Sequence, residues 1–423
     1  MIKDLISILA IGICLSSLSC INPEYDRIEF SDLEVETISA NIEGSTATVE
    51  GAVTFFNLRT ENLRVRQGIV WSAGLNPSPT VMDEVQAIEQ FVNDDFLISE
   101  QLTNLQPGIR YFARSFVEVE GTQVYGEPLS FIFNWGNTDF QNPNLLGRSN
   151  ANALVLDEQS IYLTLGNDAN NILTDTWLFN GSEWSFVNAD FGGSKRTKTV
   201  GFALQDKVYV GLGTDSFGNL LDDFFHLDGD SNWAPSSTFP TGGREGAVTF
   251  TLGNRAYIGM GKSFSNFYDD LYAFEEGGGW AGIAISGGPS ARSEAISFTI
   301  GDIAYVGLGK TGGMFHNDFY AFRAVPMPQW TKVADFPDGG RIGTVSFVIN
   351  GRGYIALGVS EQGVETDIYE YRPEDDSWSL AGTFPGAPRA NAVAFAIGNQ
   401  AIIGLGNNNE LFFNDWWGFT PEN

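Results

Sequence analysis

The sequence of 423 residues has only two cysteines and two histidines. This scarcity excludes a framework of disulfides and the cysteine- and histidine-rich sites that hold structural zinc. Positive charge is also scarce, because 23 Lys and Arg stand against 52 Asp and Glu, which gives a formal net charge of −29. Affinity for nucleic-acid phosphates comes from clustered Lys and Arg. We therefore expect no nucleic-acid partner, no metal site and no cofactor.

Both cysteines lie within the first twenty residues, and no apolar run long enough to span a membrane follows them. The apolar run Leu5 to Leu15 is too short to span a bilayer, as is typical of a secretory signal peptide. The residues up to Cys20 resemble the lipobox of bacterial lipoproteins, with Ser17 where Leu is usual. The resemblance implies a signal peptide over 1–19, lipidation of Cys20, a tether over 20–31 and an anchor in the outer membrane, facing the periplasm or the cell surface. Simple cleavage that leaves a free thiol is the alternative.

Residues 32–134 show short runs of alternating apolar and polar residues, separated by clusters of Asn, Gly and Pro. About seven such strands in ~100 residues predict a small β-sandwich. The segment Leu105 to Tyr111 resembles the tyrosine corner of fibronectin type III domains, and Trp71 is placed as the core Trp of the third strand. No group of residues here indicates chemistry, so we interpret this domain as a spacer.

From residue 148 the sequence repeats six times, at a spacing of 48 or 49 residues. Each repeat has an Arg before an alternating strand, a Gly after a second strand, an Asp before an aromatic strand and, in all but the last repeat, a late Trp. Four strands per repeat at this period predict a propeller blade. The Arg residues are Arg148, Arg196, Arg244, Arg292, Arg341 and Arg389.

The sixth repeat lacks its last strand, because the sequence ends at Asn423 shortly after Phe419. A matching segment that begins with Trp135 lies just before the first repeat. We predict that this segment closes the ring as the outer strand of the last blade, which would leave no free sheet edge. The fold class is thus all-β: a fibronectin III-like (Ig-like) sandwich followed by a monomeric six-bladed propeller over 135–423.

The repeat resembles the kelch family of propellers in its Arg, its Gly, its Asp-x-aromatic strand and its Trp. The resemblance covers about two thirds of the chain, with Gly-Leu-Gly in place of the usual double Gly in most blades. The propellers that it resembles include sialic-acid mutarotases and galactose-oxidase-like proteins. The copper site of galactose oxidase requires a Cys cross-linked to a Tyr, and no Cys lies in residues 135–423, so copper oxidase activity is excluded.

In a propeller, the start of the inner strand and the end of the second strand share one mouth of the central channel. Ten of the sixteen Lys and Arg from residue 136 onward belong to this face by alignment, which favours an anionic or polyhydroxylated ligand. The alternative is that the six Arg hold the blades together by bonding backbone carbonyls. The Asp before each aromatic strand is interpreted as stabilising a turn.

Residues two positions after each Arg differ from blade to blade and are expected at the channel rim. Lys198 and Glu294 would then form an acid–base pair for opening a sugar ring, with His316 as a third titratable group. The alternative is a surface ion pair or no pair at all. Besides the six Arg, the candidate ligand-binding residues are Asn150, Lys198, Glu294, Asn391, Lys262 and Lys310.

These observations favour an exported, lipid-anchored protein whose propeller binds a glycan or a protein partner. The first alternative is a sugar mutarotase or epimerase that uses Glu294, His316 or Lys198 as catalytic residues. The second alternative is a structural scaffold within a surface complex. The fold does not decide between them, because propellers serve all three functions.

Overall fold

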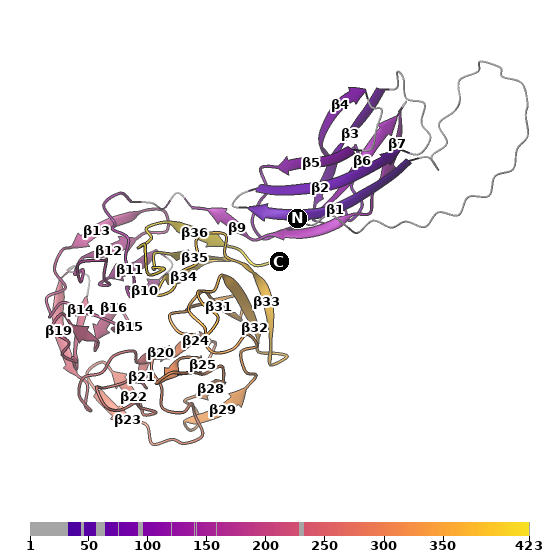
Figure 1. Ribbon diagram of the computed structural model, residues 1–423. Coiled ribbons are helices and arrows are strands. Elements are labelled where there is room, and N and C mark those ends of the chain that lie inside the picture. The colour runs from indigo at the N-terminus through magenta and orange to yellow at the C-terminus, as the bar shows by residue number, and fades with distance from the viewer. Residues whose placement is uncertain are drawn as a thin grey trace, which may run out of the picture.

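The computed structural model describes residues 33–422, apart from 44–45, 56–63, 75, 92–95, 120, 139, 141, 158 and 228–231. Within the described residues every regular element is a β-strand, and every strand pair is antiparallel. A small sandwich is followed by a ring of six four-stranded sheets (Figure 1). The signal peptide over 1–19, Cys20 and the tether over 20–31 lie outside the described residues. Within the part that is described, no helix is long and apolar enough to cross a membrane.

The sandwich has one sheet in the order β1-β2-β5 and a second in the order β4-β3-β6-β7, with β8 also paired to β6. Its core contains Val49, Ile69 and Val117, and Trp71 packs against this core from a partly buried position. The strands are β1 (Leu33–Glu43), β2 (Thr46–Phe55), β3 (Arg64–Ala73), β4 (Glu84–Phe91), β5 (Phe96–Leu102), β6 (Ile109–Val119), β7 (Thr122–Tyr125) and β8 (Leu129–Phe133).

The tyrosine corner is present between β5 and β6. The buried hydroxyl of Tyr111 accepts a hydrogen bond of 2.8 Å from the backbone N–H of Gln106. This bond fixes the turn that leads into the central strand of the second sheet.

Each blade has an inner strand, two middle strands and an outer strand. Blade 1 is β10 (Asn152–Asp157), β11 (Ser160–Thr164), β12 (Thr176–Phe179) and β13 (Trp184–Asn188). Blade 2 is β15 (Val200–Leu204), β16 (Lys207–Gly211), β18 (Asp223–Leu227) and β19 (Trp233–Thr238). Blade 3 is β20 (Val248–Leu252), β21 (Arg255–Gly259), β22 (Leu271–Glu275) and β23 (Gly279–Gly282).

The other three blades repeat this order. Blade 4 is β24 (Ile296–Ile300), β25 (Ile303–Gly307), β28 (Phe319–Arg323) and β29 (Gln329–Val333). Blade 5 is β30 (Val345–Ile349), β31 (Arg352–Ala356), β32 (Asp367–Arg372) and β33 (Ser377–Thr383). Blade 6 is β34 (Val393–Ile397), β35 (Gln400–Gly404), β36 (Trp416–Phe419) and β9 (Trp135–Asn137).

The inner strands contact one another in a closed circle because large and small residues alternate along them. On the small side, a Cβ added to Gly201 would lie 2.6 Å from Leu154 of the preceding blade. On the large side, Phe202 stacks on Tyr209 and also meets Phe274 of the following blade. The apolar cores therefore lie between blades, and a single blade could not bury them alone.

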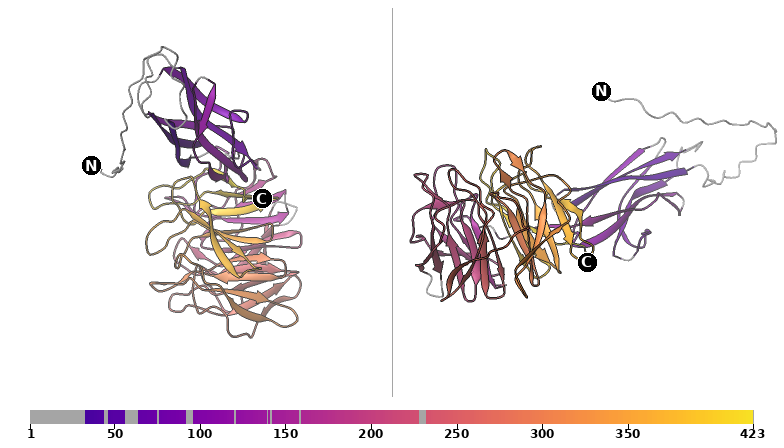
Figure 2. Two further views of the ribbon diagram at one scale, coloured as in Figure 1. Left: turned by 90° about the vertical axis from the view of Figure 1, so that its right-hand side faces the viewer. Right: turned by 90° about the horizontal axis from the view of Figure 1, so that it is seen from below.

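Strand β9 closes the ring by pairing with β36, with Phe419 opposite Trp135. Trp135 is buried and its ring packs against Phe384 and Phe419. The strand pairing is therefore the one that the sequence predicted. In Figure 2, the sandwich extends from the edge of the ring at this last blade.

Hydrogen bonds join the sandwich, the propeller and Asn134, the residue between β8 and β9. The backbone N–H of Thr420 donates to the carbonyl of Asn134, and the Asn134 side chain donates to the carbonyl of Ala381. Arg110 of β6 forms a two-pronged contact with Glu422, with distances of 2.6 and 2.8 Å. The sandwich and the propeller are thus joined by hydrogen bonds and an ion pair as well as by the covalent backbone.

Candidate functional site

A short hairpin, which we call a finger, projects between the second and third strands of each blade. The stem of each finger is a β-bridge between two backbone segments. The residue after the blade's Arg pairs with the same stem. In blade 2 both the Arg and the residue after it pair with the stem. All six fingers therefore project on the face that carries the arginines, which we call the finger face. Fingers 1 to 6 are residues 167–172, 214–220, 262–267, 310–315, 359–364 and 407–412.

A Gly at the base of each finger allows its sharp turn. Gly213 has φ of +90°, and an added Cβ would lie 2.5 Å from the carbonyl oxygen of Thr197. Its N–H donates to the carbonyl of Arg244 in the next blade at 2.8 Å. The final Gly of the Gly-Leu-Gly segment thus serves both the finger and the contact between blades.

The residues two positions after each Arg share one backbone conformation, and most of them are hydrogen-bonded through the backbone to their equivalents in a neighbouring blade. All six have φ between +52° and +62°. The N–H of Glu294 donates to the carbonyl of Gly246, and that of Asn391 donates to Gly343. The N–H of Asn150 donates to the carbonyl of Asn391, and that of Gly246 donates to the carbonyl of Lys198. Backbone hydrogen bonds therefore link the predicted rim residues in two groups, Lys198-Gly246-Glu294 and Gly343-Asn391-Asn150. Asn150, Lys198, Glu294 and Asn391 carry side chains at these positions.

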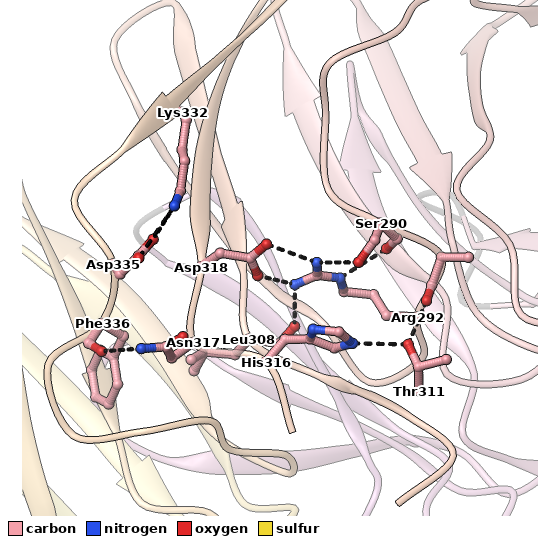
Figure 3. Close-up of polar contacts among 11 residues, drawn as sticks. Ser290, Arg292, Leu308, Thr311, His316, Asn317, Asp318, Lys332, Asp335 and Phe336 are labelled. Atoms are coloured by element: carbon pink, nitrogen blue, oxygen red, sulfur yellow. Dashed lines mark hydrogen bonds and ion pairs between the residues drawn. The ribbon is translucent and has the colours of Figure 1, made fainter. Parts of the chain in front are cut away.

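The six arginines do not face the channel, which corrects the prediction that they contact the ligand. The side chains of Arg148, Arg196, Arg244, Arg292, Arg341 and Arg389 are all 0% exposed. Each guanidinium holds both oxygens of the Asp at the start of the third strand of its own blade, as Arg292 and Asp318 do at 2.5 and 3.0 Å (Figure 3). Arg292 also donates to the carbonyl of Leu308. These residues hold the blade together and are inaccessible to a ligand.

The Asp before each aromatic strand is therefore a counter-ion rather than a turn residue. Burial alone would raise the pKa of Asp175, but hydrogen bonds from Arg148 and Trp177 and the Arg148 charge outweigh burial and hold the pKa below its ordinary value. The same balance lowers the pKa of Asp415, beside Arg389 and Trp417. Both carboxylates are ionised at neutral pH, and the six arginine charges add nothing to the finger face.

Lys198 does not pair with Glu294. Its Nζ lies 3.4 Å from Oε1 of Glu245, and the same oxygen lies 3.0 Å from Nζ of Lys262. Glu245 also accepts a hydrogen bond of 2.6 Å from the hydroxyl of Thr214. Burial raises the pKa of Glu245, but the hydroxyl of Thr214 and the two lysines outweigh burial, so the pKa is lowered. Glu245 therefore joins two of the predicted lysines as a fixed carboxylate.

Glu294 instead pairs with Lys310, at 3.3 Å. His316 donates to or accepts from the hydroxyl of Thr311 at 2.9 Å, and it lies beside the Arg292 guanidinium (Figure 3). Burial lowers the pKa of His316, and the charge of Arg292 lowers it further. Each of the three predicted catalytic groups, all within the described part of the chain, thus has a different partner, and none of them pairs with another.

Two neighbouring grooves lie between the first three fingers. The groove between fingers 1 and 2, of about 590 Å³, is called groove A, and the groove between fingers 2 and 3, of about 440 Å³, is called groove B. The lining of groove A is Asn150, Asn167, Asp168, Asn170, Asn171, Ile172, Lys195, Thr197, Lys198 and Ser216. The lining of groove B is Thr214, Gly218, Leu220, Glu245, Lys262, Ser263, Phe264, Ser265, Asn266 and Phe267. The Lys198–Glu245 pair joins the two linings.

Apolar side chains are exposed at the tips of fingers 2 and 3. Phe217 is 89% exposed and Phe264 is 82% exposed, and the turns beneath them are held by side-chain acceptors. Asp215 accepts from the N–H groups of Phe217 and Asn219, which explains this Asp without a bound ion. Two exposed rings next to polar grooves are an arrangement suited to stacking against a ligand.

Several residues that line these grooves were not predicted from the sequence. Glu245 was overlooked, although an acidic residue follows the Arg only in blade 3. The amides of finger 1, Asn167, Asn170 and Asn171, were also not predicted, although three Asn with an acidic residue occur only in fingers 1 and 6. In each case the available signal was a departure from the repeat.

The fold defines the class of the protein, which is an all-β chain with a small β-sandwich and a propeller of six four-stranded antiparallel sheets. No protein-family model matches the sequence, and no curated protein matches it. Among solved structures, one described as the structure of YjhT is similar, with a TM-score of 0.56 and 17% sequence identity. The match covers 66% of this chain and 95% of that one. At this identity the likeness shows the propeller fold alone.

Proposed function

We propose that this chain is an exported recognition protein, anchored through lipidated Cys20 to the outer membrane, whose finger face binds a glycan. The pair of grooves A and B is the observation that carries the proposal. Their volumes lie in the range of small-molecule sites, and their linings are rich in amides, hydroxyls and charged groups. Such groups bond sugar hydroxyls, while Phe264 offers an apolar face to a pyranose ring.

The titratable groups favour binding over catalysis. Lys198, Lys262 and Glu245 form one ion-pair cluster, and Lys310 and Glu294 form another. A general acid or base must reach the proton that it transfers, directly or through one water. Lys198 and Glu294, the pair expected to open a sugar ring, are engaged with other partners instead.

A glycan array probed with the wild-type protein and with Phe264→Ala tests the proposal. We expect the wild type to bind a defined set of glycans and the variant to lose about tenfold in affinity, because a stacking platform is removed from groove B. The matched control is Phe186→Ala, which removes a 55% exposed ring from the outer strand β13. If no glycan binds the wild type, or if the two variants behave alike, the proposal is wrong.

A sugar mutarotase is the second candidate, because the Glu294 carboxylate and the Lys310 amine lie 3.3 Å apart on the finger face and so, although they pair with each other, could both reach one sugar. Equilibration of sugar anomers followed by proton nuclear magnetic resonance would detect this activity. Binding of a protein partner, or a scaffold role, is supported if neither a glycan nor anomer equilibration is found.

A further inference from the structure

Lys195 differs from every other basic residue of the propeller. Of the sixteen Lys and Arg from residue 136 onward, fifteen have a carboxylate oxygen within 4.0 Å. Lys195 has no such partner among the residues that the structure describes. It is exposed and lines groove A. An unpaired cation is an unusual feature in a chain of net charge −29, in which carboxylates are abundant.

The position of Lys195 in the repeat is also exceptional. The residue before the Arg is Gly147, Gly243 or Gly340 in three other blades. A Cβ at each of these glycines would lie within 2.3 to 2.6 Å of backbone atoms of the preceding finger. Blade 2 has instead a long basic side chain at this position, beside finger 1. Lys195 thus places a long side chain in the lining of groove A, at a position where three other blades have a closely packed Gly.

The remaining lining of groove A is rich in neutral hydrogen-bonding groups. Asn170 and Asn171 belong to the turn of finger 1, where their N–H groups donate to Asp168. These hydrogen bonds are opposed by burial but hold the pKa of Asp168 below its ordinary value, so this carboxylate is ionised and committed to the turn. Thr197 and Ser216 add hydroxyl groups to the lining.

The charged groups around groove A favour an anion. Lys195 and Lys198 are the two cations of the lining, and Asp168 is its one carboxylate. Glu245 shares its charge between Lys198 and Lys262 from the neighbouring groove. Lys195 is therefore the group left to form a charge-assisted hydrogen bond with a ligand, while the amides donate to and accept from sugar hydroxyls.

From these observations we infer that groove A binds a carboxylated sugar of an acidic glycan, with Lys195 contacting the carboxylate. The inference rests on the proposed glycan-binding function and specifies its ligand. The 590 Å³ of the groove is large enough for one or two sugar units, and groove B provides a place for the chain to continue towards Phe264.

The experiment uses the full chain and isothermal titration calorimetry with hexasaccharides of galacturonate, of mannuronate and of hyaluronan. Each is compared with its carboxyl-reduced counterpart, which retains the sugar backbone without the charge. We expect at least one carboxylated hexasaccharide to bind, and its reduced counterpart to bind at least tenfold more weakly.

Lys195→Ala should weaken binding of the carboxylated hexasaccharide by about tenfold or more, and Lys195→Arg should retain most of the affinity. The matched control is Lys332→Ala, which removes the same charge from the outer strand β29, where Lys332 pairs with Asp335. Circular dichroism of each variant confirms that it is folded.

The outcomes separate this inference from the proposed function. If carboxylated and reduced sugars bind equally, glycan recognition stands and the inference about the acidic ligand is overturned. If carboxylated sugars bind but Lys195→Ala and Lys332→Ala behave alike, the assignment of Lys195 and groove A is overturned. If neither kind of sugar binds here and the glycan array is also blank, both proposals are overturned.

Discussion

At the scale of single residues, the most informative pair is the buried Arg with the Asp that lies 26 or 27 residues later in each repeat. Every blade that buries a guanidinium also needs a carboxylate beside it, because an unpaired buried charge is costly. Cation–π contacts add to the pair, as where the Arg389 guanidinium lies 4.0 Å from the Phe413 ring centre. His316 occupies the position of Phe413 in blade 4. It is therefore explained as part of this packing.

Replacing Asp415 with Asn should lower the free energy of unfolding by about 3 kcal/mol at pH 7, because Arg389 is left buried without its counter-ion. The wild-type pKa of Asp415 is depressed, so its contribution is present above the unfolded pKa of about 4 and is lost as the pH falls below it. The variant should therefore lose less stability than the wild type between about pH 4 and pH 2. Urea unfolding across this range measures both effects. Asp302→Asn, at an exposed ion pair, is the control, and equal behaviour of the two variants would contradict the prediction.

The role of the arginines was difficult to predict, because a residue repeated in every blade can either hold the blades together or line a ligand site at the channel. The constant spacing from Arg to Asp was visible, but only the folded blade shows that the two side chains meet and that nothing of the guanidinium remains exposed. The strands themselves were predictable, since a fully buried inner strand requires apolar residues on both faces. The partners of Lys198 and Glu294 were not, because they depend on which fingers lie side by side.

At the scale of elements, the stems of the fingers are alike in all six blades, whereas their tips differ. Their stems are fixed by backbone bridges to the residues around the Arg, while their tips differ from an amide-rich turn in finger 1 to exposed Phe217 in finger 2. Loops on a rigid scaffold are the usual place for binding residues. A change at a tip should alter binding without cost to the ring, whereas a change at a base should affect both.

Gly213→Ala should destabilise the propeller by about 2–3 kcal/mol, because the new Cβ would lie 2.5 Å from the Thr197 carbonyl oxygen at a φ of +90°. The matched control is Gly218→Ala in the same finger, where φ is +85° and no atom lies within 4 Å of the new Cβ. The control carries the backbone strain without the clash, so its loss of stability should be clearly smaller. Chemical denaturation of both variants provides the comparison, and equal losses would show that crowding at the finger base is unimportant.

At the scale of the whole molecule, the ring is closed by a strand that comes from before the first blade. The buried ring of Trp135 fills the space between Phe384 and Phe419, and three residue pairs join β9 to β36. Closure removes the free edges that an open ring of sheets would present. It also makes the stability of the last blade depend on residues almost three hundred positions away in the sequence.

Trp135→Ala should lower the free energy of unfolding of the propeller by about 3–5 kcal/mol, the usual cost of truncating a buried Trp. Hydrogen exchange should show the loss first in β36 and β9, while blade 3, across the ring, keeps its protection. Phe186→Ala, which removes an exposed ring, serves as the control. Uniform acceleration of exchange in all six blades would instead show that the ring opens as one unit.

The direct passage from β8 to β9, with only Asn134 between them, has a mechanical consequence. A pull on the N-terminal end of the chain is transmitted through the sandwich to the closing strand of the ring. The contacts of Thr420 with Asn134 and of Glu422 with Arg110 share that load. Tension would therefore act on the pairing of β9 with β36, and we expect this pairing to break first when the molecule is pulled.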